Sequence, residues 1–424
     1  MKTEERAVDR TVSVELEARP TKWEIAQGVV IDGYGFNGQV PGPVIETNVG
    51  DTLVVHLKNS LPEPTTIHWH GLRVPAEMDG TEIVQRPIGP GEDFEYRFRL
   101  PDAGTFWYHP HTNETQQLEK GLYGAIIVRS PDEPTLDRER VLVLDDIKLN
   151  KRGKLARFGG WFQRHNGRLG NVRLVNGRSE ASWETAAGQT ERWRVLNCAS
   201  SSYVLLSLGG RAFTVLGTDG GLLEAPVAVT EVLLGVADRV DIAVGPFEEG
   251  DQFTVEALPY ERGMLKEEGG KLFDVAVDAK QPSVASIPST LRTIAPLAAP
   301  GAEPTRLVEL GGEFNLRRGV NWHINHEAHH HADPVRVGDL QVWDVVNATK
   351  MDHPFHLHGF FFQVLEVNGE PPPWRSWEDT VNVPVEGRVR IAWLPDDRPG
   401  SWMYHCHILE HHAAGMMAHF EVTR

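Results

Sequence analysis

Cysteine is scarce in this chain: its 424 residues include only two, Cys198 and Cys406, which lie far apart in the sequence. If Cys406 binds a metal, the chain can form no internal disulfide, so a disulfide-built scaffold is excluded. Cys198, which ends the segment Val-Leu-Asn-Cys at 195–198, is then expected to be a small buried hydrophobe rather than a functional thiol.

Positive charge and long apolar runs are also in short supply. Lysine and arginine total 42 against 59 acidic residues, which gives a net charge of −17 at pH 7. Such a chain repels nucleic acid and anionic membrane surfaces, so we expect neither as a partner. No apolar run reaches the roughly 18 residues that a membrane-spanning helix needs.

An export signal is missing from the N-terminal segment. Residues 1–6, Met-Lys-Thr-Glu-Glu-Arg, contain no apolar stretch of the kind that a signal peptide requires. We expect a cytoplasmic protein, or a periplasmic or secreted one if a leader has been removed. The sequence fixes no oligomeric state.

Glycine and proline, in contrast, are plentiful, with 41 and 28 residues, which favours many short strands joined by turns. A repeat supports this interpretation, because a glycine followed nine residues later by asparagine, with β-rich residues between them, occurs three times. The three segments are Gly50 to Asn59, Gly188 to Asn197 and Gly338 to Asn347. Their spacing of about 140 residues is that of a small β-sandwich domain, so we predict an all-β chain of three tandem sandwiches.

Composition suggests where the domains begin and end. The segment Ser-Pro-Asp-Glu-Pro at 130–134 closes the first repeat unit, and residues 281–305, rich in Pro, Ala and Ser, have the composition of an extended linker. We therefore expect domain 1 over residues 1–131, domain 2 over 132–280, a linker over 281–304 and domain 3 over 305–424.

Histidines occur in four motifs with a spacing suited to metal binding. The motifs are His68-Trp69-His70, His109-Pro110-His111, His353-Pro354-Phe355-His356-Leu357-His358 and His405-Cys406-His407. In a strand, residues i and i+2 share a face, so each His-x-His pair can present two imidazoles to one place. Cys406 then points to the opposite face from its two neighbours, so one short segment can serve two separate metal centres.

The first and third repeat units share a second pattern. Residues 104–111, Gly-Thr-Phe-Trp-Tyr-His-Pro-His, align with residues 400–407, Gly-Ser-Trp-Met-Tyr-His-Cys-His, and Pro110 stands where Cys406 stands. The first unit can therefore supply imidazoles but no thiolate. The middle unit has a single histidine, His165, and is expected to bind no copper and to act as a spacer.

The ligand types indicate copper. A thiolate with imidazoles and a weak axial thioether is the ligand set of a blue-copper electron-transfer site, and we place His353, His411 and Met416 beside Cys406. Eight histidines of the motifs remain. They are too many for one four-coordinate ion, and two such ions would be left without an open coordination position for substrate. Three ions with three, three and two imidazoles fit this number better.

With these motifs, nearly the whole chain resembles the multicopper oxidases, in particular their three-domain, laccase-like bacterial members. The resemblance implies three cupredoxin-like Greek-key sandwiches and four copper ions, one of type 1, one of type 2 and two of type 3. His353, Cys406, His411 and Met416 match the type 1 ligands, and His68 and His356 match the type 2 pair. The remaining six match the ligands of the type 3 pair: His70, His109, His111, His358, His405 and His407.

The resemblance also implies a mechanism. A small phenol, an aromatic amine or a metal ion gives single electrons to the type 1 copper, and these pass from Cys406 through His405 and His407 to the other three ions. There, four electrons reduce dioxygen to water. Methionine at position 416 favours a low to moderate reduction potential of the type 1 ion.

Two residues are candidates for proton delivery to dioxygen. Asp79 stands where relatives place an acid close to the three-copper cluster; the alternative is a turn aspartate before Gly80. Relatives often carry glutamate directly after the last type 1 histidine, whereas this chain has His412, whose imidazole can carry protons near neutral pH. Asp379 is expected only to form a turn into a strand.

The sequence also allows other interpretations. The tract from His326 to His331 can gather copper ions or border the substrate pocket, but a solvated loop is favoured. A metallo-oxidase of Cu(I) or Fe(II) in copper tolerance is the alternative to a laccase, less favoured because there are only seven methionines and no Met-rich insert. A scaffold that has lost its metals is disfavoured because no ligand is missing, and a simple electron carrier needs no eight-histidine cluster.

Overall fold

The computed structural model describes residues 10–299, 301–315 and 319–424. The expectation about export rests on residues 1–6 and lies outside these ranges. Six large β-sheets, two for each of three β-sandwiches, make up the described chain together with three short helices and one two-stranded ribbon. The prediction of an all-β chain with three sandwiches is confirmed.

Domain 1 contains two four-stranded sheets. The first has the order β2 (Val29–Phe36), β1 (Thr11–Ala26), β4 (Thr52–Asn59) and β6 (Asp93–Arg99). The second has the order β3 (Ile45–Asn48), β8 (Gly124–Arg129), β7 (Gly104–His109) and β5 (His68–His70). Apolar side chains at alternate positions of both sheets, among them Leu53, Val55 and Phe106, pack between them as one core.

Domain 2 also contains two sheets, which have six and five strands. One has the order β10 (Val172–Val175), β9 (Arg138–Ile147), β12 (Glu191–Asn197), β17 (Arg239–Val244), β14 (Phe213–Thr218) and β15 (Gly221–Val229). The other has the order β11 (Ser182–Ala186), β21 (Gly270–Asp278), β18 (Gln252–Leu258), β13 (Val204–Ser207) and β16 (Glu231–Leu234). The ribbon pairs β19 (Tyr260–Glu261) with β20 (Lys266–Glu267).

Domain 3 carries the C-terminal strands. Its first sheet has the order β23 (Gly319–Ile324), β22 (Arg306–Asn315), β26 (Gln341–Asn347), β30 (Arg388–Trp393) and β28 (Phe362–Val367). Its second has the order β24 (His330–His331), β32 (Met417–Thr423), β31 (Gly400–Cys406), β27 (His353–Leu357) and β29 (Thr380–Val383), and β25 (Val335–Arg336) also pairs with β32.

The repeated asparagine has a structural role at the end of β4, β12 and β26. Asn59, Asn197 and Asn347 are each at most 1% exposed, and each donates its side-chain amide to the backbone carbonyls of two other segments. Each side-chain carbonyl in turn accepts the N–H of the residue two positions later. The asparagine thus fixes the loop that leaves its strand, which explains its recurrence in all three domains.

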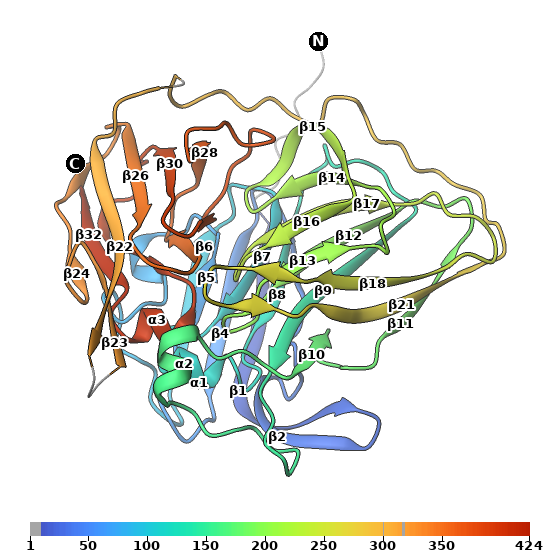
Figure 1. Cartoon of the computed structure of the whole chain (residues 1–424), viewed down its shortest axis with the longest axis horizontal. Coiled ribbons are helices and arrows are strands. Elements are labelled where there is room, and N and C mark those ends of the chain that lie inside the picture. The colour runs from blue at the N-terminus through green and yellow to red at the C-terminus, as the bar shows by residue number, and fades with distance from the viewer. Residues whose placement is uncertain (1–9, 300, 316–318) are drawn as a thin grey trace.

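The three sandwiches are packed against one another (Figure 1). The strands of domain 3, orange to red, and those of domain 2, green to yellow, lie on opposite sides of the view, with blue strands of domain 1 between and below them. β7 packs against β14, β15 and β17 of domain 2, and the 3₁₀ turn Ala76–Met78 packs against β31. Among the described residues, no helix is long and apolar enough to cross a bilayer.

Short helices connect the domains beside the histidine motifs. They are α1 (Glu114–Gln117), α2 (Trp161–Asn166) and α3 (Leu409–Ala413). α2, from the middle domain, packs against both α3 and β23, and α1 packs against α3. The middle domain is therefore more than a distant spacer, because one of its helices reaches the segment that carries His411.

Candidate metal centres

Strand pairing brings the His-x-His motifs together. β5 lies antiparallel to β7 with His68 opposite His109, and β27 lies antiparallel to β31 with His356 opposite His405. The two strand pairs occupy matching places in domains 1 and 3, and their imidazoles point to a common interior. All eight of these imidazoles are at most 8% exposed.

The eight imidazoles fall into groups that combine both domains. His70, His109 and His407 form one group of three, and His111, His358 and His405 form a second. His68 and His356 lie together beside His70, and within each such group the ligand atoms lie within 4.8 Å of one another. The number of histidines predicts three ions with three, three and two imidazoles, and these groups are compatible with that arrangement if His68 and His356 form the pair.

Hydrogen bonds orient the rings in a repeated manner. The Nδ1 atoms of His68, His109, His356 and His405 each lie 2.9–3.0 Å from a backbone carbonyl oxygen, to which they donate. This fixes the tautomer and leaves Nε2 as the atom with a free lone pair. Of these four rings, His405 directs its Nε2 toward Nε2 of His358, at 3.0 Å.

Buried nitrogen atoms without a partner show that the cluster fits metal ions. The atoms without a hydrogen-bond partner include Nε2 of His68, His109, His111, His356 and His407. Buried polar atoms are otherwise almost always paired, so such a collection indicates ligands of metal ions. Burial and the neighbouring imidazoles lower the pKa of His109, His111 and His407 far below the usual 6.5, which keeps them neutral and able to bind metal.

A second centre lies on the other face of β31. The atoms Cys406 Sγ, His353 Nδ1 and His411 Nδ1 form a triangle with sides of 3.4, 3.7 and 3.3 Å. Met416 is fully buried. Its backbone carbonyl accepts the N–H of Cys406 at 3.1 Å, so the residue lies beside this triangle. A trigonal His₂Cys set with a nearby methionine fits a blue-copper ion.

The surroundings of this triangle prepare it for metal binding. His353 Nε2 lies 2.8 Å from the Thr349 hydroxyl, and His411 Nε2 donates to the carbonyl of His165 at 3.1 Å, so both Nδ1 atoms face the sulfur. Burial raises the pKa of Cys406 to about 12, which means that a metal must displace the thiol proton when it binds.

This second centre is closed to solvent. The four side chains of His353, Cys406, His411 and Met416 are all 0% exposed. The ring of Trp322, on β23, lies 4.0 Å from that of His411 and covers it. Behind it, His165 of α2 stacks on Trp322 at 6.1 Å, and Trp161 stacks on His165 at 5.5 Å.

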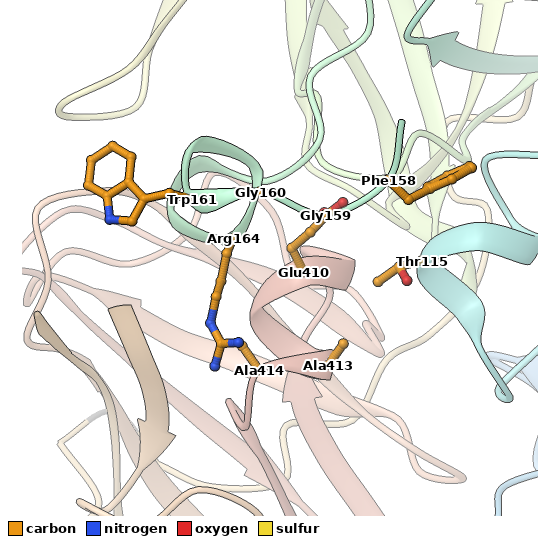
Figure 2. Close-up of a pocket in the computed structure, with 9 residues that line it drawn as sticks. All are labelled: Thr115, Phe158, Gly159, Gly160, Trp161, Arg164, Glu410, Ala413 and Ala414. Carbon is orange, nitrogen blue, oxygen red and sulfur yellow. The ribbon is translucent and has the colours of Figure 1, made fainter. Parts of the chain in front are cut away.

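A pocket of about 400 Å³ opens beside the second centre, between α2 and α3 (Figure 2). Phe158 and Trp161 line it on opposite sides, with their rings directed outward in this view, and Arg164 reaches from α2 toward Ala414 at the end of α3. Glu410, which also lines it, precedes His411. Burial, followed by the negative charge of Glu119, raises the pKa of Glu410 to about 8, so its carboxyl is mostly neutral at pH 7.

Asp79 lies at the eight-histidine cluster. Its carboxylate accepts a hydrogen bond from His358 Nδ1 at 2.9 Å, its carbonyl accepts one from His68, and the residue is 0% exposed. Gly80, next to it, has a φ of +81°, and a Cβ there would come within 1.7 Å of the Ile67 carbonyl. The turn and the contact with the histidines are thus both present.

Asp379 also contacts the cluster, although the sequence suggested only a turn. Directly before β29, its carboxylate lies 2.9 Å from His70 Nε2, and its carbonyl accepts from His356 Nδ1. Burial alone would raise the pKa of Asp379, but the charge of Arg239 from domain 2, in contact with it, holds this pKa well below its usual value. No local motif marks this residue, because its partners come from three domains.

His412 has a partner that the sequence did not reveal. Its ring stacks on His405 at 4.2 Å, and its Nδ1 forms an ion-pair contact with the buried carboxylate of Glu114, on α1. The other oxygen of Glu114 lies 3.8 Å from His111 Nδ1. A carboxylate therefore lies near the cluster, supplied by α1 rather than by the position after His411.

Comparisons with known proteins agree with this geometry. Family models described as multicopper oxidase match residues 17–133, 104–271 and 303–424. The multicopper oxidase MmcO of Mycobacterium tuberculosis is 34% identical over 96% of this chain and 86% of its own length. The described fold and sites define a copper-dependent oxidoreductase that uses dioxygen. The chain belongs to the multicopper oxidase family.

Solved structures support the same conclusion. A multicopper oxidase from Campylobacter jejuni, described as a metallo-oxidase, is 31% identical with a TM-score of 0.87 and covers 99% of this chain and 93% of its own. A laccase from Pediococcus acidilactici is 27% identical with a TM-score of 0.84, covering 99% and 91%. The domains are thus cupredoxin-like, and the family implies four copper ions, one of type 1, one of type 2 and two of type 3.

Proposed function

We propose that this multicopper oxidase is of the laccase type and oxidises small phenols or aromatic amines. The observation that carries the proposal is the pocket between α2 and α3, which is lined by Glu410, the residue before His411, and by the aromatic residues Phe158 and Trp161. Four one-electron oxidations balance the reduction of one dioxygen, with four protons, to two waters. When bound, the copper ions accept these electrons singly and deliver them to dioxygen.

The ligand roles proposed for the residues follow the groups described above. We assign His353, Cys406 and His411, with Met416 nearby, to the type 1 ion. His68 and His356 are assigned to the type 2 ion. The two groups of three are assigned to the type 3 pair: His70, His109 and His407, and His111, His358 and His405. The unpartnered nitrogens of the cluster and the triangle around Cys406 support this assignment.

The charge of the pocket favours an uncharged aromatic donor over a metal cation. The Glu410 carboxyl is mostly neutral at pH 7, because its pKa is raised to about 8, and Arg164 adds a positive charge. A cation would therefore meet repulsion without a compensating carboxylate. A phenol ring, in contrast, can stack on the half-exposed ring of Trp161.

Stacked rings link this pocket to His411. Trp161 is 52% exposed, and the series continues inward through His165 and Trp322, with successive ring planes inclined by 21°, 16° and 34°. Because the type 1 ligands are closed to solvent, a donor cannot touch them. We propose that electrons tunnel from a donor at Trp161 through these rings toward His411.

Protons for dioxygen reduction are proposed to come from two sides of the cluster. Asp79, bonded to His358, would serve one side, and His412 with Glu114 would serve the side of His405. His412 keeps its proposed role, with the missing carboxylate supplied from α1. Both routes end on groups that are buried and that contact histidines of the cluster, as general acid catalysis requires.

A metallo-oxidase remains the second candidate, because the similar Campylobacter jejuni protein is described as one. Turnover of 2,6-dimethoxyphenol and of Cu(I) by the copper-loaded enzyme separates the two. Trp161→Ala should lower kcat/KM for the phenol about tenfold, the effect of losing one aromatic contact, and leave kcat/KM for Cu(I) unchanged.

Phe162→Ala is the matched control for this experiment, because Phe162 is the adjacent aromatic residue, is 51% exposed and does not line the pocket. This control should leave both specificity constants unchanged. A specificity constant for Cu(I) far above that for the phenol, or a Trp161→Ala variant that oxidises the phenol like the wild type, would overturn the laccase proposal.

A further inference from the structure

A second concentration of histidines lies on domain 3, outside both centres. Nine of the 19 histidines are not among the ligands assigned above. Six of these nine come from β23, β24, β32 and the loop between β23 and β24: His323, His326, His329, His330, His331 and His419. The loop is joined to the segment before Met416, since the N–H of His329 donates to the carbonyl of Gly415.

Strand register gathers carboxylates around the first of these histidines. On the antiparallel pair of β22 and β23, His323 lies opposite Gly311. Glu309 and Glu313 flank Gly311 at two residues on either side, so they share its face with His323. A Cβ on Gly311 would come within 2.1 Å of Cε1 of His323, so this glycine makes room for the imidazole to lie across the strand.

The turn after β23 adds a second imidazole beside the first. The ring of His326 lies 5.6 Å from that of His323, and its Nε2 lies 3.4 Å from the Glu309 carboxylate. Rings that share a group in the eight-histidine cluster have similar separations: 5.0 Å for His70 and His407, and 5.8 Å for His68 and His356. Two imidazoles and a carboxylate thus converge from two strands and a turn.

His323 carries the independent indication of a ligand. It is 7% exposed, yet its Nδ1 is buried without a hydrogen-bond partner. Such an atom costs free energy unless something binds it. Burial, with the nearby ring of His326, also lowers the pKa of His323, so the imidazole is neutral and its lone pair is available at pH 7.

We propose that His323, His326 and Glu309 bind a further first-row divalent ion, in addition to the four coppers. Imidazole with carboxylate suits Cu(II), Zn(II) and Ni(II), and among these Cu(II) binds most tightly to a given set of such ligands. Trp322, adjacent to His323 but on the opposite face of β23, contacts His411, so the bound ion lies one residue from the ring that covers the type 1 ligands. The proposal does not depend on which reductant the enzyme uses.

The test adds Cu(II) to the full chain already loaded with four coppers. Equilibrium dialysis with metal analysis should find one additional copper per chain, with a type 2 electron paramagnetic resonance signal that shows two nitrogen ligands. His323→Ala and His326→Ala should each weaken this binding by about ten- to a hundredfold, the cost of losing a ligand or its support. Glu309→Gln should weaken it as well.

His56→Ala is the matched control, since His56 also pairs with a glutamate, Glu95 at 3.5 Å, on the surface of domain 1. It should not change the binding of the additional copper. If His323→Ala fails to fold, His326→Ala decides the question, because the His326 side chain is 74% exposed. Absence of an additional copper in the wild type, or its retention in His326→Ala, would overturn the proposal, and so would its loss only in His331→Ala or His419→Ala.

Discussion

Single residues around the eight-histidine cluster differ in how visible they are in the sequence. Asp79 could be predicted from the resemblance, because it stands where relatives place an acid, and the structure places its carboxylate against His358. Asp379 and Glu114 could not, since their contacts with His70 and His412 join segments about 300 residues apart. A carboxylate acquires its environment from such distant partners, which local spacing does not encode.

At this scale, Asp79→Asn tests the proton route. Asparagine keeps an oxygen that can accept the His358 hydrogen bond but cannot deliver a proton, so dioxygen reduction should slow about a hundredfold. The blue absorption band should stay intact, because Asp79 is not part of the triangle around Cys406. Stopped-flow reoxidation of the fully reduced enzyme by dioxygen measures the rate, and an unchanged rate would rule the role out.

Among the elements, β31 and its counterpart β7 were the most predictable. Their aligned sequences predicted two strands with imidazoles on one face, and the pairings of His68 with His109 and of His356 with His405 agree with that prediction. The repeated asparagine marked the ends of three strands in the sequence. Its role, to donate hydrogen bonds to carbonyls of two other segments, became visible only in the structure. Helix α2 was not predicted, because six residues carry no clear periodicity.

Asn347→Ala tests what the end of β26 contributes. The Asn347 amide donates to the carbonyls of Met351, Val383 and Pro384, and its loss leaves buried carbonyls unpaired, so the free energy of unfolding should fall by about 3 kcal/mol. Because Met351 precedes the type 1 ligand His353 by two residues, the blue band should also shift. Denaturant unfolding and absorption spectra measure both effects.

The equivalent Asn197→Ala in domain 2 is the control for that experiment. Asn197 makes the same three hydrogen bonds to carbonyls, so its replacement should destabilise the protein by a similar amount. No assigned ligand lies next to it, and the blue band should therefore remain where it is. A shifted band in both variants would show that the effect is general rather than local.

When copper is absent, the buried imidazoles make the stability of the whole molecule depend on pH. In the folded chain, burial is the largest cause of pKa values well below 6.5 for four of these imidazoles, those of His70, His358, His405 and His407. In the unfolded chain these groups titrate near 6.5, so below that pH the unfolded state binds protons that the folded state does not. The free energy of unfolding of the copper-free protein should therefore fall as the pH falls below about 6.5, by about 1.4 kcal/mol per pH unit for each such group.

Calorimetry of the copper-free and copper-loaded protein between pH 8 and pH 5 measures this dependence. The melting temperature of the copper-free protein should be nearly constant above pH 7 and drop steeply below pH 6. Bound copper occupies the same nitrogens, so the loaded protein should lose less stability over this range. A copper-free protein whose melting temperature is as insensitive to acid as that of the loaded form would contradict the account.

The central claim is that β31 serves two centres, with the thiolate of Cys406 on one face and the imidazoles of His405 and His407 on the other. Copper content and absorption of the wild type and of Cys406→Ala test it most directly. The wild type should hold about four coppers and show the blue band. Cys406→Ala should hold about three coppers and show no blue band, because only one centre loses its ligand. Loss of all four coppers, or a blue band that survives in Cys406→Ala, would contradict the claim.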